Sequence, residues 1–151
     1  MVQIFQTYIL PHIRYCYSVW SPYLKKDIDL IESIQRRFTK MIEGLHHLSY
    51  EERLKVLGLP MIKDSGRKWD LIQTYRILNG IDKVDKDMFA HVRDMHNKGT
   101  RHASKNNLVL NKSKLDLRKN FFCNRVIADW NSLPQEVQRA KTLKSFIAQL
   151  N

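Results

Sequence analysis

The chain has 151 residues, 43% of them hydrophobic and 10% aromatic, and a formal net charge of +11. This length and apolar content predict one folded domain with a hydrophobic core and exclude a wholly disordered chain. The excess of positive charge favours an anionic partner, either a nucleic acid or an acidic membrane surface.

The sequence lacks the features of a secreted or membrane-spanning protein. Polar residues interrupt the apolar stretches well before the length of about 18 residues that a membrane span requires. The first residues have neither the charged region nor the cleavage site of a secretory signal. We therefore expect a cytoplasmic or nuclear protein with no membrane partner, in which Cys16 and Cys123 are reduced and packed.

Apolar side chains recur every three or four positions at the start of the chain, and this spacing predicts two long helices. The first covers residues 4–19, with Pro11 either kinking it or lying in its first turn. The second runs from Leu24 to Gly44, with acidic residues near its start and basic residues near its end, as the helix dipole favours. Its apolar stripe is expected to face the core and comprises Leu24, Ile28, Ile31, Ile34, Phe38, Met41 and Leu45.

Capping signals mark the next two helices. Ser49 and Glu52 have the spacing of a capping box, which predicts a short helix that ends at Gly58. A further helix is predicted over residues 67–78, before the Gly at position 80. Its inward side chains are expected to be Trp69, Ile72, Tyr75 and either Ile77 or Leu78.

A strongly basic segment follows, and it predicts an irregular loop over residues 93–117. Residues 93–125 hold nine Lys or Arg against two Asp, so a net charge of +7 lies in this segment. Dense like charge is unfavourable unless an anion relieves the repulsion. We therefore expect contacts with the backbone of RNA or DNA, and a solvated basic loop is the alternative. The candidate phosphate contacts are Arg101, Lys105, Lys112, Lys114, Arg118, Lys119 and Arg125.

Helices are expected on both sides of this loop. A short helix capped by Asp85 could occupy residues 82–92. A second helix is predicted over residues 118–131, and a last helix begins after its cap, Thr142. Residues 108–110 and 115–117 could pair as a short β-hairpin.

The expected fold class is all-α, a compact bundle of five to seven helices with a basic irregular insertion. The single domain divides into a helical part over 1–92, the basic loop over 93–117 and C-terminal helices over 118–151.

No combination of residues in the sequence supports catalysis. A polymerase needs carboxylates that hold two metal ions, and the chain has no adjacent Asp-Asp pair. Phosphate-binding glycine loops, serine nucleophile elbows and zinc-binding helices are also missing. We predict no catalytic residue, no cofactor and no metal ligand. The large aromatic side chains are expected to be core, with base-stacking platforms as the alternative, and comprise Trp20, Trp69, Trp130, Phe121 and Phe122.

Several sequence blocks occur together in the order typical of one protein family. They are Trp20-Ser21-Pro22, Gln35-Arg36-Arg37, Leu48-Ser49-Tyr50-Glu51-Glu52-Arg53-Leu54, Leu57-Gly58-Leu59-Pro60, Leu117-Arg118-Lys119-Asn120-Phe121-Phe122 and Trp130-Asn131-Ser132-Leu133-Pro134. With smaller blocks between them they cover nearly the whole chain. The chain resembles the region downstream of the polymerase core in the reverse transcriptase of non-LTR (LINE, Jockey-like) retrotransposons.

This resemblance implies a non-catalytic remnant of an RNA-directed DNA polymerase that has lost its polymerase and endonuclease domains. Met1 falls inside what the family has as continuous polypeptide, so a fragment is expected. The remnant would hold template RNA or target DNA, and the missing polymerase domain would be its partner. Asp64-Ser65-Gly66 replaces the Tyr-Arg-Arg stretch of the family, which weakens a phosphate contact there. The alternative is an inert packing or protein-interaction module with no nucleic-acid site.

Overall fold

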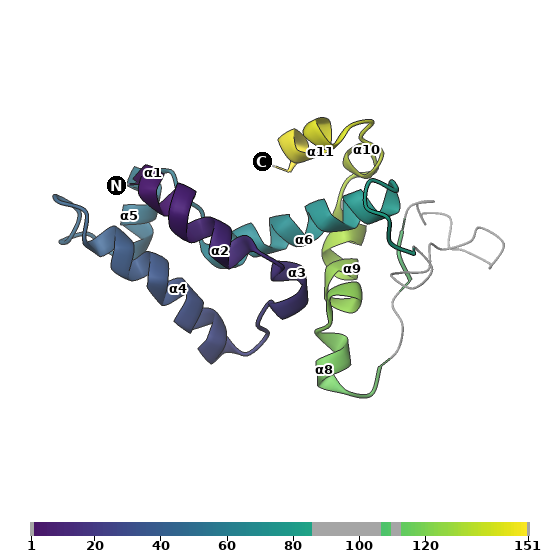
Figure 1. The fold of residues 1–151 in the computed structure, drawn as a ribbon, viewed down its shortest axis with the longest axis horizontal. Coiled ribbons are helices and arrows are strands. Elements are labelled where there is room, and N and C mark those ends of the chain that lie inside the picture. Colours follow the sequence, from purple (N-terminus) through teal and green to yellow (C-terminus); the bar gives the residue numbers. More distant parts are fainter. Residues whose placement is uncertain (1, 86–106, 110–112, 151) are drawn as a thin grey trace. The chain divides into compact units, whose positions relative to one another are not determined.

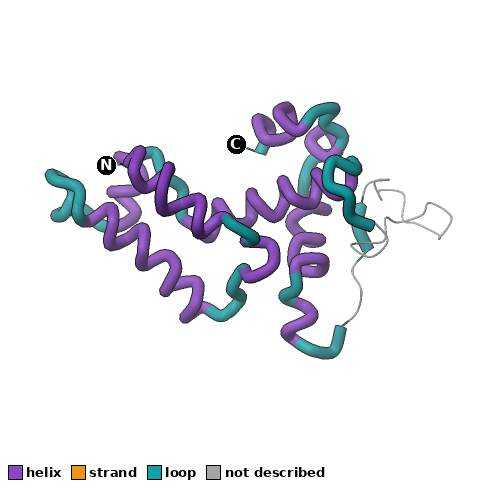
Figure 2. The backbone as a smooth tube through the Cα atoms, viewed as in Figure 1, coloured by secondary structure: helices purple, strands orange, loops and turns teal. Residues whose placement is uncertain are grey.

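The computed structural model describes residues 2–85, 107–109 and 113–150, and helices dominate these residues (Figures 1 and 2). The all-α fold class is confirmed. The chain separates into two compact units, Met1–Trp69 and Asp70–Asn151, and each is described on its own. The expectation of a single domain stays a prediction.

The first predicted helix is a series of short pieces in the N-terminal unit. Helix α1 (Val2–Ile4) leads into a π-helical turn, η1 (Phe5–Ile9), and then into α2 (Leu10–Arg14) and α3 (Tyr17–Trp20). Pro11 lies in the first turn of α2, where its missing N–H costs little. Cys16 has a left-handed backbone with φ of 50°, which ends the helical path before α3. Such a conformation at a non-glycine residue is not evident from helical spacing.

The next two helices follow their capping signals. Helix α4 (Lys25–Lys40) is followed by turns that contain Gly44, with φ of 81°. Helix α5 (Tyr50–Leu57) begins with the predicted capping box: Ser49 Oγ accepts from Glu52 N, and Glu52 Oε2 accepts from Ser49 N at 2.8 Å. Gly58, with φ of 63°, ends α5 as predicted, since a left-handed cap favours glycine.

The buried face of α4 differs from the predicted apolar stripe. Phe38 is buried and its ring lies 4.9 Å from that of Phe5. Leu24, Ile34 and Met41, which were expected to face the core, are 42%, 42% and 70% exposed. The helix instead buries polar side chains, Glu32, Gln35 and Thr39. Each of them makes at least one hydrogen bond that replaces a contact with water, although Gln35 Oε1 is buried with no hydrogen-bond partner among the described residues.

Helix α6 (Ile62–Leu78) begins five residues before its predicted start at position 67. The Glu32 carboxylate accepts hydrogen bonds from the backbone N–H groups of Ile62 (3.2 Å) and Lys63 (3.3 Å). These groups have no partner within their own helix, and a negative charge at a helix start is favourable. A side chain 30 residues away thus caps α6.

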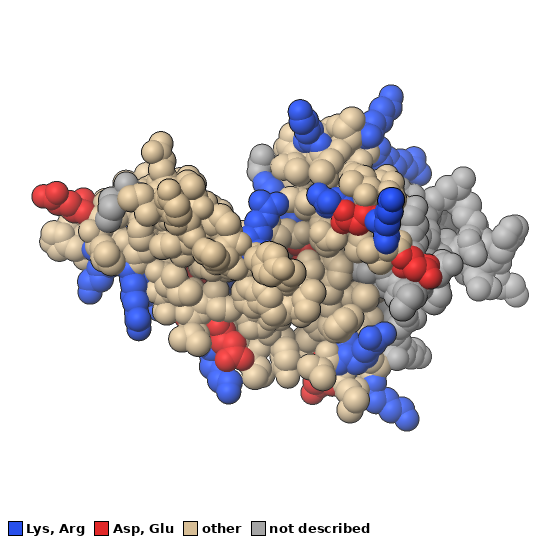
Figure 3. Space-filling view, in the orientation of Figure 1, with Lys and Arg blue, Asp and Glu red and all other residues tan. Residues whose placement is uncertain are grey.

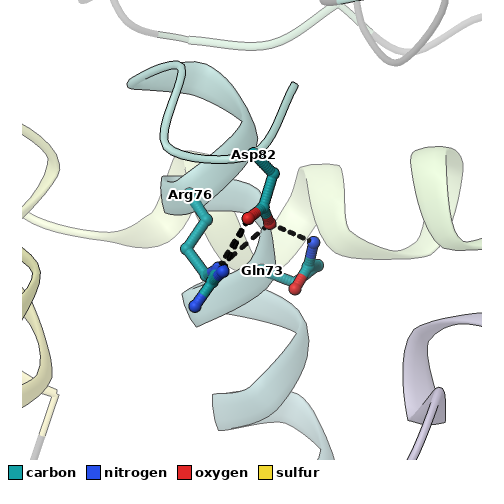
Figure 4. A network of polar contacts seen from close by, with 3 residues as sticks. All are labelled: Gln73, Arg76 and Asp82. Carbon is teal, nitrogen blue, oxygen red and sulfur yellow. Dashed lines mark hydrogen bonds and ion pairs between the residues drawn. The ribbon is translucent and has the colours of Figure 1, made fainter. Parts of the chain in front are cut away.

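The C-terminal end of α6 is closed by a polar network (Figure 4). Arg76 Nη2 donates to Asp82 Oδ1 at 2.6 Å, and Gln73 Nε2 donates to Asp82 Oδ2 at 2.8 Å. Gly80 provides the left-handed turn, with φ of 68°, that brings Asp82 back to the helix. The hydrogen bond from Arg76 keeps the pKa of the Asp82 carboxyl below its ordinary value.

Four more helices are described in the C-terminal unit: α8 (Asp116–Lys119), α9 (Phe122–Ser132), α10 (Gln135–Gln138) and α11 (Leu143–Gln149). The helix predicted over 118–131 is broken at residues 120–121. The second strand of the predicted hairpin is wrong, because Asp116 and Leu117 are helical. Thr142 caps α11 as predicted, accepting from Ser145 N at 3.2 Å. The helix predicted at 82–92 and most of the basic loop lie outside the described residues.

Aromatic packing forms the core of the C-terminal unit. Trp130 is 1% exposed and Phe146 is fully buried. The Phe146 ring stacks on that of Tyr75, with centroids 4.4 Å apart, and the Tyr75 hydroxyl donates to Ala140 O at 2.6 Å. Asn131 pins Leu108 to this core through both its amide atoms, accepting from Leu108 N at 2.9 Å and donating to Leu108 O at 3.0 Å. The inward stripe predicted for α9 is confirmed, comprising Phe122, Val126, Ile127 and Trp130.

Candidate nucleic-acid interface

The described candidate cations lie at the start of the C-terminal helices. Arg101, Lys105 and Lys112 fall outside the described residues. Lys114 precedes α8, whereas Arg118 and Lys119 lie on it, and all three side chains are exposed. Figure 3 shows Lys and Arg side chains projecting at the position of α8.

One carboxylate, that of Asp116, accompanies these cations. Lys119 Nζ lies 2.8 Å from Asp116 Oδ1 in an exposed pair, and its hydrogen bond lowers the pKa of the Asp116 carboxyl. Exposed pairs of this kind are weak, because water and salt screen them. Three cations against one carboxylate leave the α8 surface positive, so a phosphate can compete for Lys119.

Arg125 has a different environment from the other described candidates. Its side chain is 19% exposed, and its Nε lies 2.9 Å from Asp70 Oδ2. A second bond joins Nη2 to Asp70 Oδ1 at 3.1 Å, and Nη1 donates to Asn120 O at 3.3 Å. The guanidinium therefore connects α6, α9 and the break between α8 and α9. Its phosphate contact stays a prediction, and a phosphate would have to compete with Asp70.

Hydrogen bonds hold the break between α8 and α9 in one conformation. Phe121 O accepts from the backbone N–H groups of Asn124 (2.9 Å) and Arg125 (3.0 Å). The buried Asn124 side chain donates from Nδ2 to Arg118 O at 2.7 Å. The local sequence favours continued helix here, but Asn124 and Arg125 stabilise the interruption. The exposed cations of α8 are thus attached to a well-anchored backbone.

The five large aromatic side chains divide between core and surface. Trp130 and Phe122 are buried, which confirms the core interpretation for both. Trp69 is half-buried, with its ring centroid 5.1 Å from that of Tyr17. Trp20 and Phe121 are exposed, so the core interpretation is wrong for them. The Arg118 guanidinium lies over the Phe121 ring, 5.4 Å from its centroid.

A second set of exposed cations was not predicted. Arg139, Lys141 and Lys144 lie between α10 and α11 or at the start of α11, and all three are exposed. Figure 3 shows Lys and Arg side chains over this part of the C-terminal unit. They lie within six residues, 139–144, that contain no Asp or Glu, so a local count of charge could have identified them. Lys144, on α11, also lies off the apolar stripe of that helix.

Side chains of α4 and α5 form a largely buried polar cluster in the N-terminal unit. The Tyr50 hydroxyl donates to Glu32 Oε1, and Arg53 donates from Nε to Thr39 Oγ1 at 3.2 Å and from Nη1 to Leu48 O at 2.6 Å. Burial, together with the bond to Glu32, raises the pKa of Tyr50 above its ordinary value of 10.0. The cluster joins α4, α5 and the start of α6, and these contacts give it a structural role.

Among the described residues, neither the cysteines nor the potential metal-binding side chains form a second candidate site. Cys16 is exposed, so its expected packing is wrong, whereas Cys123 is half-buried and burial raises the pKa of its thiol. In the described part of the chain, His, Cys, Asp and Glu side chains form no group of three or more that could hold a metal ion. None of the described helices has the length and apolar character to cross a membrane.

Comparisons of the chain with models of protein families, with curated proteins and with solved structures found no match.

Proposed function

We propose that the chain is a non-catalytic nucleic-acid-binding module, a remnant of the region that follows the polymerase core in a non-LTR retrotransposon reverse transcriptase. The sequence resemblance supports the origin. The observation that carries the binding function is the positive surface of α8, where Lys114, Arg118 and Lys119 face solvent with Asp116 as their carboxylate neighbour. In the parent protein this surface would hold template RNA or target DNA near the missing polymerase domain.

The expected mode of binding is contact with phosphates. Lys and Arg side chains neutralise phosphates and release the counterions around the nucleic acid, which stabilises the complex most at low salt. Such contacts fix position and carry no base information, so we expect little dependence on base sequence. The net charge of +11 adds a long-range attraction to the same ligand.

Polymerisation is not part of the proposed function, because the sequence contains no adjacent Asp-Asp pair to hold the metal ions. The test combines two measurements on the purified chain. Fluorescence anisotropy should detect binding to labelled single-stranded RNA and to duplex DNA at low salt. A primed RNA template with Mg²⁺ or Mn²⁺ should gain no nucleotides. Extension above a mock preparation, or no binding to either ligand, would contradict the proposal.

A second candidate function, a packing or protein-interaction module, is favoured by the outer face of α4. Leu30 and Ile34 lie four residues apart on α4 and are 67% and 42% exposed, and Met41, directly after its last residue, is 70% exposed. An exposed apolar surface of this kind is typical of an interface with another protein. If this were the whole function, the chain would bind neither RNA nor DNA at low salt. Replacing Leu30 and Ile34 with Glu would then improve the solubility of the protein and leave its lack of nucleic-acid binding unchanged.

A further inference from the structure

The structure presents one large aromatic ring beside the positive surface of α8. Phe121 is 46% exposed, although an apolar ring of this size normally favours burial. Its neighbour in sequence, Phe122, is buried in the core, so the two rings have opposite environments. Phe122 is therefore the ring that packs into the core at the start of α9. The exposure of Phe121 leaves its ring available to a ligand.

The Phe121 ring is attached to a backbone with little freedom to move. Its carbonyl accepts two hydrogen bonds from the first turn of α9, and its N–H donates to Arg118 O at 3.3 Å. Asn124 fixes that same Arg118 carbonyl from the other side. A backbone held in this way loses little conformational entropy when a ligand binds to the ring that it carries.

The Arg118 guanidinium lies over this ring, 5.4 Å from its centroid. A guanidinium plane and an aromatic ring can both stack against a nucleic-acid base, and the cation also attracts the phosphate next to that base. Lys114 and Lys119 supply further positive charge from the same short segment. An exposed aromatic ring can stack on an unpaired base, and the nearby cations can contact its phosphates, so together they suit a single-stranded nucleic acid.

We propose that Phe121 and Arg118 form a base-stacking subsite, which makes the α8 surface prefer single-stranded RNA or DNA to a duplex. The inference rests on the proposed function and deepens it. In a duplex each base is already stacked and paired, so its face is not accessible without the cost of unpairing. A duplex therefore gains only the phosphate contacts, whereas a single strand gains these and a stacking contact.

The test compares Phe121→Ala with the matched control Leu117→Ala, which shortens an apolar side chain that is 72% exposed on the same segment. Binding is measured by anisotropy with labelled oligoadenylate and with duplex DNA. Phe121→Ala should weaken binding of oligoadenylate by about tenfold and leave binding of the duplex and the salt slopes unchanged. Leu117→Ala should change neither affinity. A thermal melt of each variant checks that the fold is intact.

Phe121→Trp provides a second readout that does not depend on loss of affinity. Its additional fluorescence, relative to the wild type, should be quenched by oligoadenylate and not by the duplex, because only a stacked base contacts the ring. Equal losses on both ligands, no loss for Phe121→Ala, or the same loss for Leu117→Ala would overturn the stacking subsite. Wild-type protein that binds neither ligand at low salt would instead contradict the proposed function itself.

Discussion

Arg125 and Asp70 lie 55 residues apart in the sequence and form a two-point ion pair within the C-terminal unit. The side chains are 19% and 9% exposed, so the pair is largely shielded from water. It joins α9 to the second half of α6, and Arg125 also reaches Asn120 O at the break after α8. The most buried of the four described candidates for phosphate binding thus has a structural partner of opposite charge.

Removing the carboxylate of this pair should destabilise the protein. Asp70→Ala removes the carboxylate that balances the largely buried Arg125 charge, and we expect a loss of about 3 kcal/mol in the free energy of unfolding. Urea unfolding followed by circular dichroism measures it. Asp116→Ala, which breaks the exposed pair with Lys119, is the control and should leave the urea midpoint nearly unchanged. Equal effects from both variants would show that the Asp70 pair is not shielded.

Gly66 should tolerate no larger side chain, although it lies within helix α6. A Cβ atom at this position would lie 2.2 Å from the Tyr17 hydroxyl oxygen. Tyr17 cannot easily move, because it is buried and its ring contacts those of Trp20 and Trp69 at 5.1 Å. Alanine normally stabilises a helix by about 1 kcal/mol relative to glycine, but here overpacking should reverse the sign and cost about 1–3 kcal/mol. A higher melting temperature for Gly66→Ala would contradict this packing.

Tyr50 should make the protein sensitive to alkaline pH. Its pKa is raised in the folded state, mainly by burial and then by the bond to Glu32, whereas in the unfolded chain it titrates at its ordinary value of 10.0. The stability that depends on the neutral hydroxyl is complete below that value and is lost as pH rises above it. We expect Tyr50→Phe to reduce the slope of stability against pH above pH 10.0, as measured by urea unfolding. An identical slope in both proteins would exclude Tyr50 as the cause.

Replacing Trp130 distinguishes a role in the core from a role in ligand binding. Since it is 1% exposed and its ring centroid lies 5.9 Å from that of Phe146, Trp130→Ala should cost about 3–5 kcal/mol in stability. Thermal melting measures this loss, and Trp20→Ala, at an exposed position, should cost much less. Loss of RNA binding with an unchanged melting curve would instead indicate that Trp130 stacks on a base.

Local signals in the sequence predicted the parts of the fold that depend on neighbouring residues. The Ser49 and Glu52 capping box, the Gly58 cap and the Thr142 cap are all as expected. The Trp130 stripe of α9 is also correct, because its helical spacing is regular. The start of α6 could not be predicted in this way, since its cap comes from Glu32 on another helix.

The candidate interface could also be predicted only where it depends on residues that are close in sequence. Exposure of Lys114, Arg118 and Lys119 agrees with the charge pattern from which they were chosen. The charge pattern could not reveal that Arg125 meets Asp70, because the two residues are distant in sequence. The prediction also overlooked Arg139, Lys141 and Lys144, although these three cations lie within six residues that contain no acidic side chain. The roles of Arg101, Lys105 and Lys112 stay predictions.

The salt dependence of binding tests the central claim, that cations on and beside α8 contact phosphates. The logarithm of the affinity for single-stranded RNA should fall with the logarithm of salt concentration by about 0.7 for each phosphate contact. Replacing Lys114, Arg118 and Lys119 together with Gln should flatten this slope by about two units. The same replacement of Lys25, Lys26 and Lys55, exposed cations of the N-terminal unit, is the control and should leave the slope nearly unchanged. Equal changes in the two triple variants would contradict the claim, because they would indicate diffuse attraction without a site.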